Sequence, residues 1–329
     1  MKIPEILIIE SLHKPGSLAK VLQVIGDAGQ VVEGINQLRR NSQTTLWELT
    51  IETDEYFTAE SLIEKLNALP NAKVIGKSDR VFNRHQGGKL QMISRQEINT
   101  LEQLRDLYTP GVARVCLAIQ KNPSLAVQYT SRNNTVAIIT NGTAILGLGN
   151  IGPLAGLPVM EGKAALMHQL VGLSGIPILI NETEPHKLIE IIRSISLSFG
   201  AIQLEDFRAP ECFEIESELM KTLDIPIMHD DQHGTATVVL SALLSVAKRL
   251  NLDLSECAIG QIGLGAAGIG ICNLILHYGA KKVFGSDIQK SAMNRLESIG
   301  GHAVSLSDLM KMSDIVIATT GVKNLIKPE

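Results

Sequence analysis

The stretch Gly263-Leu-Gly265-Ala-Ala-Gly268 constrains the fold of this chain more than any other. It matches the pattern GxGxxG and has the context that the pattern needs, since residues 257–262 form a short apolar run and residues 266–278 have a helical composition. A second apolar run, residues 282–286, ends at Asp287, where a carboxylate can bind the hydroxyls of an adenosine ribose. These features predict a Rossmann-type dinucleotide-binding domain, and they favour NAD over NADP because Asp287 would repel the additional phosphate.

A similar pattern, Gly147-Leu-Gly149-Asn-Ile-Gly152, does not predict a nucleotide site. Pro153, Gly156 and Pro158 follow it, so we expect no regular helix to begin there. Gly172 lies where an acidic residue would be expected. We interpret this stretch as a loop of a substrate-binding domain.

The last predicted strand, residues 314–318, ends in Thr319-Thr320-Gly321, and a doubly wound fold would bring Thr319 and Gly321 to the cofactor. About four strands are visible in residues 235–329, whereas two mononucleotide-binding halves need about six. We therefore expect this domain to be incomplete at its C-terminal side and the sequence to be a fragment.

Composition excludes several classes of protein. With 329 residues, of which 45% are hydrophobic, the chain can fill two or three cores and is not disordered. The net charge is −4 and the basic residues are dispersed, so nucleic acid is not an expected partner. The longest apolar run, around residues 238–247, is too short to span a membrane, and the N-terminus lacks a secretion signal, so a cytoplasmic protein is predicted. The four widely spaced cysteines are expected to be reduced, buried small side chains.

Residues 1–83 follow the order βαββαβ, which is typical of a ferredoxin-like α+β domain. The predicted strands are residues 3–9, 31–39, 44–53 and 72–82, and the predicted helices are residues 16–28 and 58–69. The segment Lys14-Pro-Gly-Ser-Leu-Ala-Lys-Val-Leu22 resembles the ACT domain, a small regulatory module. This resemblance implies an amino-acid or related effector near residues 14–17, often at a dimer interface. A dimerisation domain without a ligand is the alternative.

Residues 84–94 are polar, contain a Gly-Gly pair and are predicted to be a linker. Residues 95–234 then alternate between helix and strand patterns, which predicts an α/β substrate domain with a parallel sheet. The expected helices are residues 101–107, 111–120, 162–171 and 186–196, and the expected strands are residues 135–140, 176–180 and 201–204. An apolar helix, residues 235–250, begins the dinucleotide-binding domain of residues 235–329.

The largest concentration of candidate catalytic or metal-binding side chains in the sequence includes two acidic pairs, Glu205-Asp206 and Asp230-Asp231. Four carboxylates brought together would repel one another unless a cation lay among them, and Mg²⁺ or Mn²⁺ prefers oxygen ligands of this kind. Capping of the following helix is an alternative role for Asp230 and Asp231, although it leaves Glu205 and Asp206 unexplained.

His229 and His233 are four residues apart, which raises the alternative of a zinc peptidase. That motif needs both histidines on one helix and a glutamate after the first, but Asp230 stands at that position. Pro226 and Gly234 make a regular helix through both histidines unexpected.

Two further residues are candidates for proton transfer. Lys163 is predicted to lie at the start of a helix, where the helix dipole and desolvation would lower the pKa of its amine and suit it to act as a general base. Tyr108 precedes a proline-glycine turn, and its phenol could donate a proton.

Several motifs together resemble those of the malic enzymes in order and approximate spacing. They are YTPGVA at 108–113, ILGLGN at 145–150, GLPVMEGKAAL at 156–166, LEDF at 204–207, HDDQHGTA at 229–236 and the GLGAAG turn. The resemblance extends over residues 95–329. It implies that Glu205, Asp206 and Asp231 bind the divalent metal, that Lys163 is the general base and Tyr108 the general acid, and that Asp230 pairs with Lys163. The implied reaction is oxidative decarboxylation of malate to pyruvate and CO2 with reduction of NAD.

The sequence departs from the family at Asn141 and Asn150, where aspartates are expected. A malolactic enzyme, which would convert malate to lactate and CO2, would share the named motifs. An effector-binding protein without catalytic activity is an alternative of another class. The expected assembly is a homo-dimer or homo-tetramer.

Overall fold

The computed structural model describes residues 3–53, 59–78, 80–145, 147–322 and 325–326. The chain divides into two compact units, Met1–Lys89 and Leu90–Glu329.

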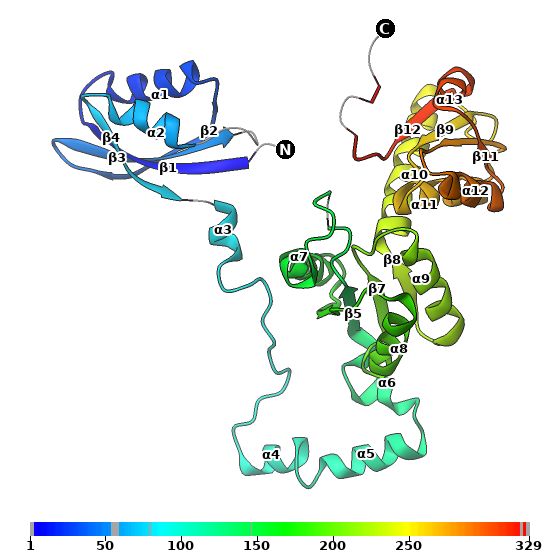
Figure 1. Cartoon of the computed structure of the whole chain (residues 1–329). Coiled ribbons are helices and arrows are strands. Elements are labelled where there is room, and N and C mark those ends of the chain that lie inside the picture. The colour runs from blue at the N-terminus through cyan, green and yellow to red at the C-terminus, as the bar shows by residue number, and fades with distance from the viewer. Residues whose placement is uncertain (1–2, 54–58, 79, 146, 323–324, 327–329) are drawn as a thin grey trace. The chain divides into compact units, whose positions relative to one another are not determined.

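The N-terminal unit has the predicted βαββαβ order. Its elements are β1 (Ile3–Leu12), α1 (Ser17–Asp27), β2 (Val31–Arg40), β3 (Thr44–Thr53), α2 (Ala59–Asn67) and β4 (Ala72–Ser78). The strands form an antiparallel sheet in the order β2-β3-β1-β4, and both helices cover the same face (Figure 1). Alternate residues of the strands point to that face. Leu7 and Leu49 from the sheet therefore pack with Val21 and Leu62 from the helices.

The last predicted strand of this unit was too long. Pairing between β1 and β4 ends at Ser78, and α3 (Arg80–His85) follows. The predicted strand extended to residue 82, which lies inside α3, and α3 also includes the first two residues of the predicted linker. The predicted start of the second helix, residue 58, lies outside the described residues.

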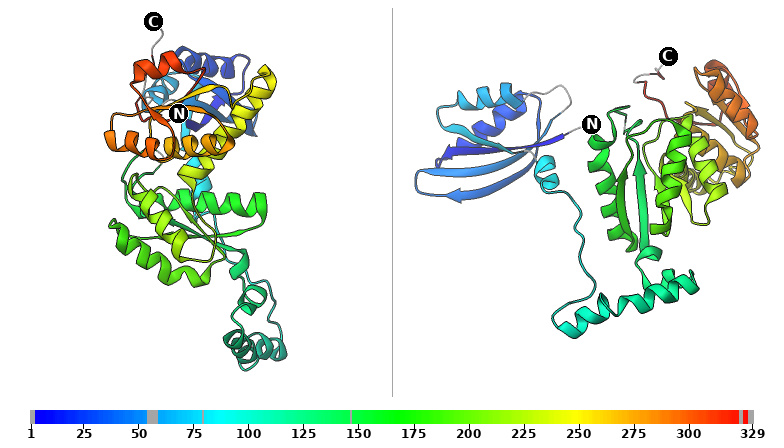
Figure 2. Two further views of the ribbon diagram at one scale, coloured as in Figure 1. Left: turned by 90° about the vertical axis from the view of Figure 1, so that its right-hand side faces the viewer. Right: turned by 60° about the horizontal axis from the view of Figure 1, so that its bottom comes forward.

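The second unit begins with three short helices, α4 (Leu101–Leu107), α5 (Val112–Lys121) and α6 (Leu125–Tyr129). A parallel sheet follows in the order β6-β5-β7-β8, formed by β5 (Thr135–Thr140), β6 (Ser174–Leu179), β7 (Ala201–Leu204) and β8 (Ile227–His229). Helix α7 (Pro153–Val171) covers one face, and α8 (Pro185–Ile195) and α9 (Glu211–Thr222) cover the other (Figures 1 and 2). Ile138 faces α7, whereas Ala137 and Ile139 face α8 and α9.

Helix α7 corrects two predictions. We expected no helix directly after Gly152 and placed one at residues 162–171, but α7 begins at Pro153. Proline is favourable in the first turn, where its missing N–H would have no helical partner. Pro158 lies inside the helix, and burial of Met160 and Ala164 against Ile138 offsets its lost hydrogen bond.

A long helix, α10 (Asp230–Leu250), connects this sheet to the next. The third sheet is parallel, in the order β11-β10-β9-β12, and consists of β9 (Ala258–Ile262), β10 (Lys282–Ser286), β11 (His302–Ala303) and β12 (Ile315–Ala318). Helices α11 (Ala266–Tyr278), α12 (Lys290–Ser298) and α13 (Leu306–Met312) separate the strands in sequence. Numbered in sequence, the strands lie in the order 3-2-1-4, which is how a doubly wound dinucleotide-binding sheet begins.

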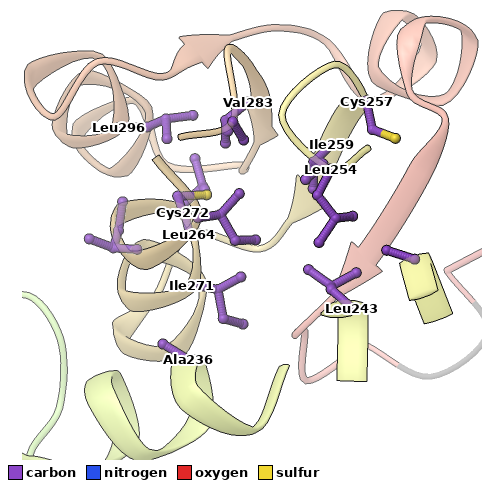
Figure 3. Close-up of a cluster of buried hydrophobic side chains, with 14 of the residues drawn as sticks. Ala236, Leu243, Leu254, Cys257, Ile259, Leu264, Ile271, Cys272, Val283 and Leu296 are labelled. Carbon is purple, nitrogen blue, oxygen red and sulfur yellow. The ribbon is translucent and has the colours of Figure 1, made fainter. Parts of the chain in front are cut away.

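The core of the third sheet joins α10 to α11. Figure 3 shows Leu243 from α10 with Ile271 and Cys272 from α11, close to Ile259 and Val283 from the strands. This packing fixes the carboxylate-bearing start of α10 relative to the glycine turn that precedes α11. Within the described part of the chain, no helix is long and apolar enough to cross a membrane.

The cysteine prediction holds for three of the four side chains. Cys212, Cys257 and Cys272 are buried, whereas Cys116 is exposed on α5. All four are free. Burial raises the pKa of the Cys212 thiol, with a further contribution from the charge of Asp231, and it raises the pKa of Cys272, in both cases to about 12.

Candidate active site

Three carboxylates meet at the carboxyl edge of the β6-β5-β7-β8 sheet. Glu205 and Asp206 follow β7, and Asp231 lies in the first turn of α10, directly after β8. Because β7 and β8 are parallel neighbours, their ends lie at the same edge. One ligand atom from each carboxylate lies within 4.8 Å of the other two. These are the three residues for which the sequence predicted metal binding.

The backbone around Asp206 is adapted to this arrangement. Asp206 has a φ of 58°, in the left-handed region that residues other than glycine rarely occupy. Its N–H donates to Asp231 Oδ2 at 2.9 Å. This conformation costs about 1–3 kcal/mol and is typical of functional sites, where the surrounding structure holds it in place.

Lys163 lies beside the cluster. Its Nζ is 2.6 Å from Asp230 Oδ2 and 3.4 Å from Glu205 Oε1. The predicted pairing of Lys163 with Asp230 therefore agrees with the geometry, whereas the predicted position at a helix start is wrong, because Lys163 lies in the middle of α7.

The predicted direction of the Lys163 pKa shift is also wrong. Burial lowers the pKa of this amine, but the hydrogen bond to Asp230 and the charges of Glu205 and Asp230 together outweigh burial and raise it. Without a compensating positive charge, Lys163 is therefore an ammonium group. The prediction failed because it counted the helix dipole and desolvation and omitted two carboxylates that are distant in sequence.

The cluster suits a hard divalent cation. Burial, reinforced by the charges of Asp230 and Asp231, raises the pKa of Glu205 to about 7. Three carboxylates at this spacing supply the all-oxygen ligands that Mg²⁺ and Mn²⁺ prefer, so the donor set fits such an ion.

Helix α10 begins at Asp230, earlier than the predicted residue 235, and His229 is its N-cap residue. Asp230 and Asp231 therefore lie in the first turn, where the helix dipole favours negative charge, and they do not cap the helix. Gly234, one turn later, leaves room for Asp230, since a Cβ atom there would lie 2.6 Å from Asp230 Oδ1. No sequence pattern predicts a role for Gly234 in the site, although it is part of the HDDQHGTA motif.

The two histidines of that motif do not form a zinc-peptidase site. His229 precedes α10 and is fully buried, with Nδ1 3.1 Å from Gln232 Nε2. His233 lies on α10 with Nε2 2.9 Å from Glu216 Oε1. The two rings thus have different partners, and the metal-type cluster found among the described residues contains neither of them.

The glycine turn of the third sheet has the geometry that its pattern predicts. Gly263 has a φ of 85°, and a Cβ atom on it would lie 2.5 Å from Thr319 O. A Cβ atom on Gly268 would lie 1.9 Å from Gly263 O, so the start of α11 can pack against the turn only without a side chain. A Cβ atom on Gly265 would meet nothing within 4 Å, which leaves space for a ligand to approach the backbone.

Two neighbouring segments lie against this turn. Asp287, at the end of β10, accepts the N–H of Leu264 at Oδ2 at 2.7 Å. Thr319, after β12, accepts from Gln261 Nε2 at 2.8 Å. Gly321, two residues after Thr319, is exposed and would have open space around a side chain. The predicted cofactor-binding residues therefore gather at one edge of the third sheet.

Tyr108 is separate from the other predicted residues. It is the C-cap residue of α4 and 67% exposed. Helix α6 leads into the N-terminal end of β5 (Figure 1), whereas the carboxylates follow the carboxyl ends of β7 and β8. Among the described residues, no hydrogen bond joins Tyr108 to Lys163 or to the carboxylate cluster.

The two asparagines that depart from the family motifs differ in environment. Asn141 is buried, its Nδ2 donates to Glu182 O at 3.2 Å, and its Oδ1 accepts from Thr143 Oγ1 at 2.7 Å. An aspartate carboxylate could not make the first of these bonds. Asn150 is exposed in the loop before α7.

The fold and the site together define a class of α/β protein. One parallel sheet carries a cluster of carboxylates with a lysine, and the next carries a glycine turn of the type that binds dinucleotides. The family model for the N-terminal domain of malic enzymes matches residues 87–189. Over 324 residues, 98% of this chain, the sequence is 48% identical to NAD-dependent malic enzyme 1 of Bacillus subtilis, of which it covers 74%. The chain belongs to the malic enzyme family.

Two further relatives agree with this assignment. The chain is 40% identical to the NAD-dependent malic enzyme of Geobacillus stearothermophilus over 282 residues, 86% of this chain, but spans 59% of that protein. A crystal structure of the NAD-dependent malic enzyme of Thermotoga maritima is similar with a TM-score of 0.70 and 36% identity, covering 76% of this chain and 70% of that one.

Proposed function

We propose that this protein catalyses the oxidative decarboxylation of malate to pyruvate and CO2 with reduction of NAD, and that it requires Mg²⁺ or Mn²⁺. The observation that carries this proposal is the position of Lys163 Nζ, 2.6 Å from Asp230 Oδ2 and adjacent to the cluster of Glu205, Asp206 and Asp231. The NAD-dependent relatives and the carboxylate of Asp287 beside the glycine turn support NAD as the cofactor.

In the first step, Lys163 takes the proton of the malate hydroxyl at Nζ as hydride passes from the carbon that carries this hydroxyl to the nicotinamide of NAD. Lys163 must enter this step as a free amine, which requires a positive charge, such as that of the cation, to offset the carboxylates that otherwise keep it protonated. Asp230 keeps the resulting ammonium in place through their hydrogen bond. A divalent cation held by Glu205, Asp206 and Asp231 would supply the charge that offsets these carboxylates and would polarise the hydroxyl and keto oxygens of the substrate. After CO2 leaves, the three-carbon product needs a proton at carbon, and Tyr108 is the proposed donor.

The position of Tyr108 supports a homo-oligomer, a dimer or tetramer, as the active form. Helices α4, α5 and α6 contain no buried residue, and Leu101, Leu117 and Tyr108 are among their exposed large side chains. A second copy that covered these helices could receive Tyr108 at its own Lys163 site. Mixing Tyr108→Phe with Lys163→Ala chains would then restore part of the activity that each lacks alone, whereas no recovery in a verified mixed dimer would contradict this arrangement.

The test of the main proposal is incubation with malate, NAD and Mn²⁺, followed by measurement of NADH absorbance and identification of the product. We expect NADH and pyruvate to accumulate together and EDTA to stop both. Lactate without net NADH would identify the malolactic alternative. No consumption of malate with either metal would contradict the proposal and would leave the effector-binding alternative.

We also propose that the N-terminal unit is an ACT-like module that binds a small carboxylate such as an amino acid. A cavity of about 420 Å³ lies where β1 leads into α1, and its lining includes His13, Lys14, Ser17 and Trp47. Lys14 offers the positive charge that a carboxylate needs, and Trp47, which donates to Ser11 Oγ at 2.9 Å, offers an apolar wall. Calorimetric titration with amino acids tests this role, and Lys14→Ala should weaken any binding. No binding of any amino acid would leave the dimerisation role as the alternative.

A further inference from the structure

Next to the carboxylate cluster lies a second buried polar group that the proposed mechanism does not use. It consists of Glu216, His229 and Gln232, which are 7%, 0% and 5% exposed. Buried polar side chains destabilise a fold unless they are paired, so their contacts indicate what they hold in place.

Glu216 joins α9 to the start of α10. Its Oε1 accepts the backbone N–H of His229 at 2.7 Å, and its Oε2 accepts from Gln232 Nε2 at 3.1 Å. Because an ionised carboxylate can only accept, the nitrogen of the Gln232 amide must face Glu216. This fixes the orientation of the Gln232 side chain.

Gln232 in turn fixes the tautomer of His229. The same Nε2 atom lies 3.1 Å from His229 Nδ1. An amide nitrogen donates, so Nδ1 accepts, and the proton of the neutral ring is on Nε2.

The Nε2 side of the His229 ring faces a predicted metal ligand. Nε2 lies 3.0 Å from Asp231 Oδ2, and this is the oxygen that accepts the N–H of Asp206. Among the described residues, the buried Nε2 atom has no hydrogen-bond partner, so its close contact with Asp231 leaves the Nε2 proton unsatisfied in this arrangement.

We propose that Glu216 and Gln232 hold His229 so that its Nε2–H faces Asp231 Oδ2, and that His229 thereby positions the Asp231 carboxylate to bind the cation. Asp206 N–H donates to Oδ2, and His229 Nε2 lies 3.0 Å from the same oxygen, so Oδ1 is the oxygen left for the cation. Groups that orient a metal ligand in this way typically contribute about 10–100-fold to metal affinity. His229, Gln232 and Glu216 are thus positioning residues. This inference rests on the proposed metal-dependent function.

The test is the affinity for Mn²⁺ alone, measured from the electron paramagnetic resonance signal of the free ion in titrations without malate or NAD. We expect His229→Leu to bind Mn²⁺ about 10–100-fold more weakly than the unmodified chain. His229→Gln, whose amide N–H can reach the same position, should bind with nearly unmodified affinity. The matched control is His186→Leu, which removes an exposed histidine on α8 and should leave Mn²⁺ affinity unchanged.

Thermal unfolding separates positioning from a loss of fold, because a purely structural role would lower the melting temperature and leave the affinity of the folded fraction intact. If His229→Leu lacks a cooperative transition, His229→Asn replaces it in the test, since the asparagine oxygen can still accept from Gln232 but the side chain is too short to reach Asp231.

The outcomes distinguish this inference from the function on which it rests. No Mn²⁺ binding by the unmodified chain, or equal binding by Asp231→Ala, would overturn the proposed metal site and this inference with it. Mn²⁺ binding by the unmodified chain with equal affinity in the folded His229→Leu variant would overturn the positioning role alone. An equal loss of affinity in His229→Leu and His229→Gln would also contradict it, because the second variant keeps the donor.

Discussion

The carboxylate cluster and the glycine turn both lie at the carboxyl ends of parallel strands, yet they depend on different parts of the chain. The cluster consists of ionisable side chains, of which Glu205 and Asp206 are buried, so its function depends on which charged groups lie around it. The glycine turn leaves open space through which a ligand can approach its backbone. Its function therefore depends on the absence of side chains at Gly265 and Gly268. Substitutions should therefore change charge and proton transfer at the first site and cofactor access or packing at the second.

The largest expected effects are at the cluster, where two substitutions should separate proton transfer from metal binding. Lys163→Ala removes the proposed general base and should lower kcat by about 10²–10⁴-fold while leaving Mn²⁺ affinity near that of the unmodified chain. Asp231→Ala removes a proposed metal ligand and should abolish turnover together with most Mn²⁺ binding. Steady-state kinetics and Mn²⁺ titration measure both effects.

Lys187→Ala is the control for the loss of a lysine, because Lys187 pairs with Glu182 on the exposed start of α8. It should retain both activity and Mn²⁺ affinity. Equal loss of Mn²⁺ affinity in Lys163→Ala and Asp231→Ala would contradict the separate roles of the two residues.

At the glycine turn, a matched pair of substitutions should separate cofactor access from packing. Gly265→Ala places a methyl group in open space and should raise the KM for NAD without lowering the melting temperature. Gly268→Ala places its Cβ atom 1.9 Å from Gly263 O and should destabilise the fold by about 1–3 kcal/mol, as overpacking does. Equal melting temperatures for the two variants would show that the turn is not packed as described.

The sequence predicted those parts of the molecule that depend on local patterns. Apolar runs and flanking glycines indicate where an element begins and ends. The elements that have the predicted bounds include β5, β7, β10, α4 and α11. Glu205, Asp206 and Asp231 could be grouped because adjacent acidic pairs would repel one another without a cation, and because the resemblance to the malic enzymes implied these three as ligands.

The features that the sequence did not predict depend on contacts between distant residues. The pKa of Lys163 depends on Asp230, 67 residues away, so the helix position alone gave the wrong direction. Helix α7 begins at Pro153 because packing on β5 outweighs the cost of Pro158. The contact of Glu216 with His229 joins α9, which was not predicted, to the start of α10.

An intermediate effect is expected at Gly234, because the missing side chain leaves room for the Asp230 carboxylate. Alanine is more favourable than glycine inside a helix by about 0.5–1 kcal/mol, so Gly234→Ala should keep or raise the melting temperature. Its Cβ atom would lie 2.6 Å from Asp230 Oδ1, which should displace Asp230 from Lys163 and lower kcat. Gly162→Ala in α7 is the matched control, since its Cβ atom meets nothing within 4 Å. An unchanged kcat in Gly234→Ala would show that Asp230 need not hold its position.

The smallest expected effect is a change in cofactor preference at Asp287. Its carboxylate accepts the N–H groups of Leu264 at Oδ2 and Gln289 at Oδ1, so it is held at the glycine turn with its charge near the proposed ribose position. Asp287→Asn keeps a carbonyl acceptor but removes the charge that would repel the 2′-phosphate of NADP. We expect the ratio of kcat/KM for NADP to that for NAD to rise about tenfold, equivalent to roughly 1.4 kcal/mol. Glu297→Gln, which removes one exposed charge on α12, controls for the change in net charge and should leave the ratio unchanged. If Asp287→Asn leaves the ratio of kcat/KM for NADP to that for NAD unchanged, Asp287 does not set the cofactor preference. The glycine turn would then bind the cofactor through its backbone without a contribution from this side-chain charge.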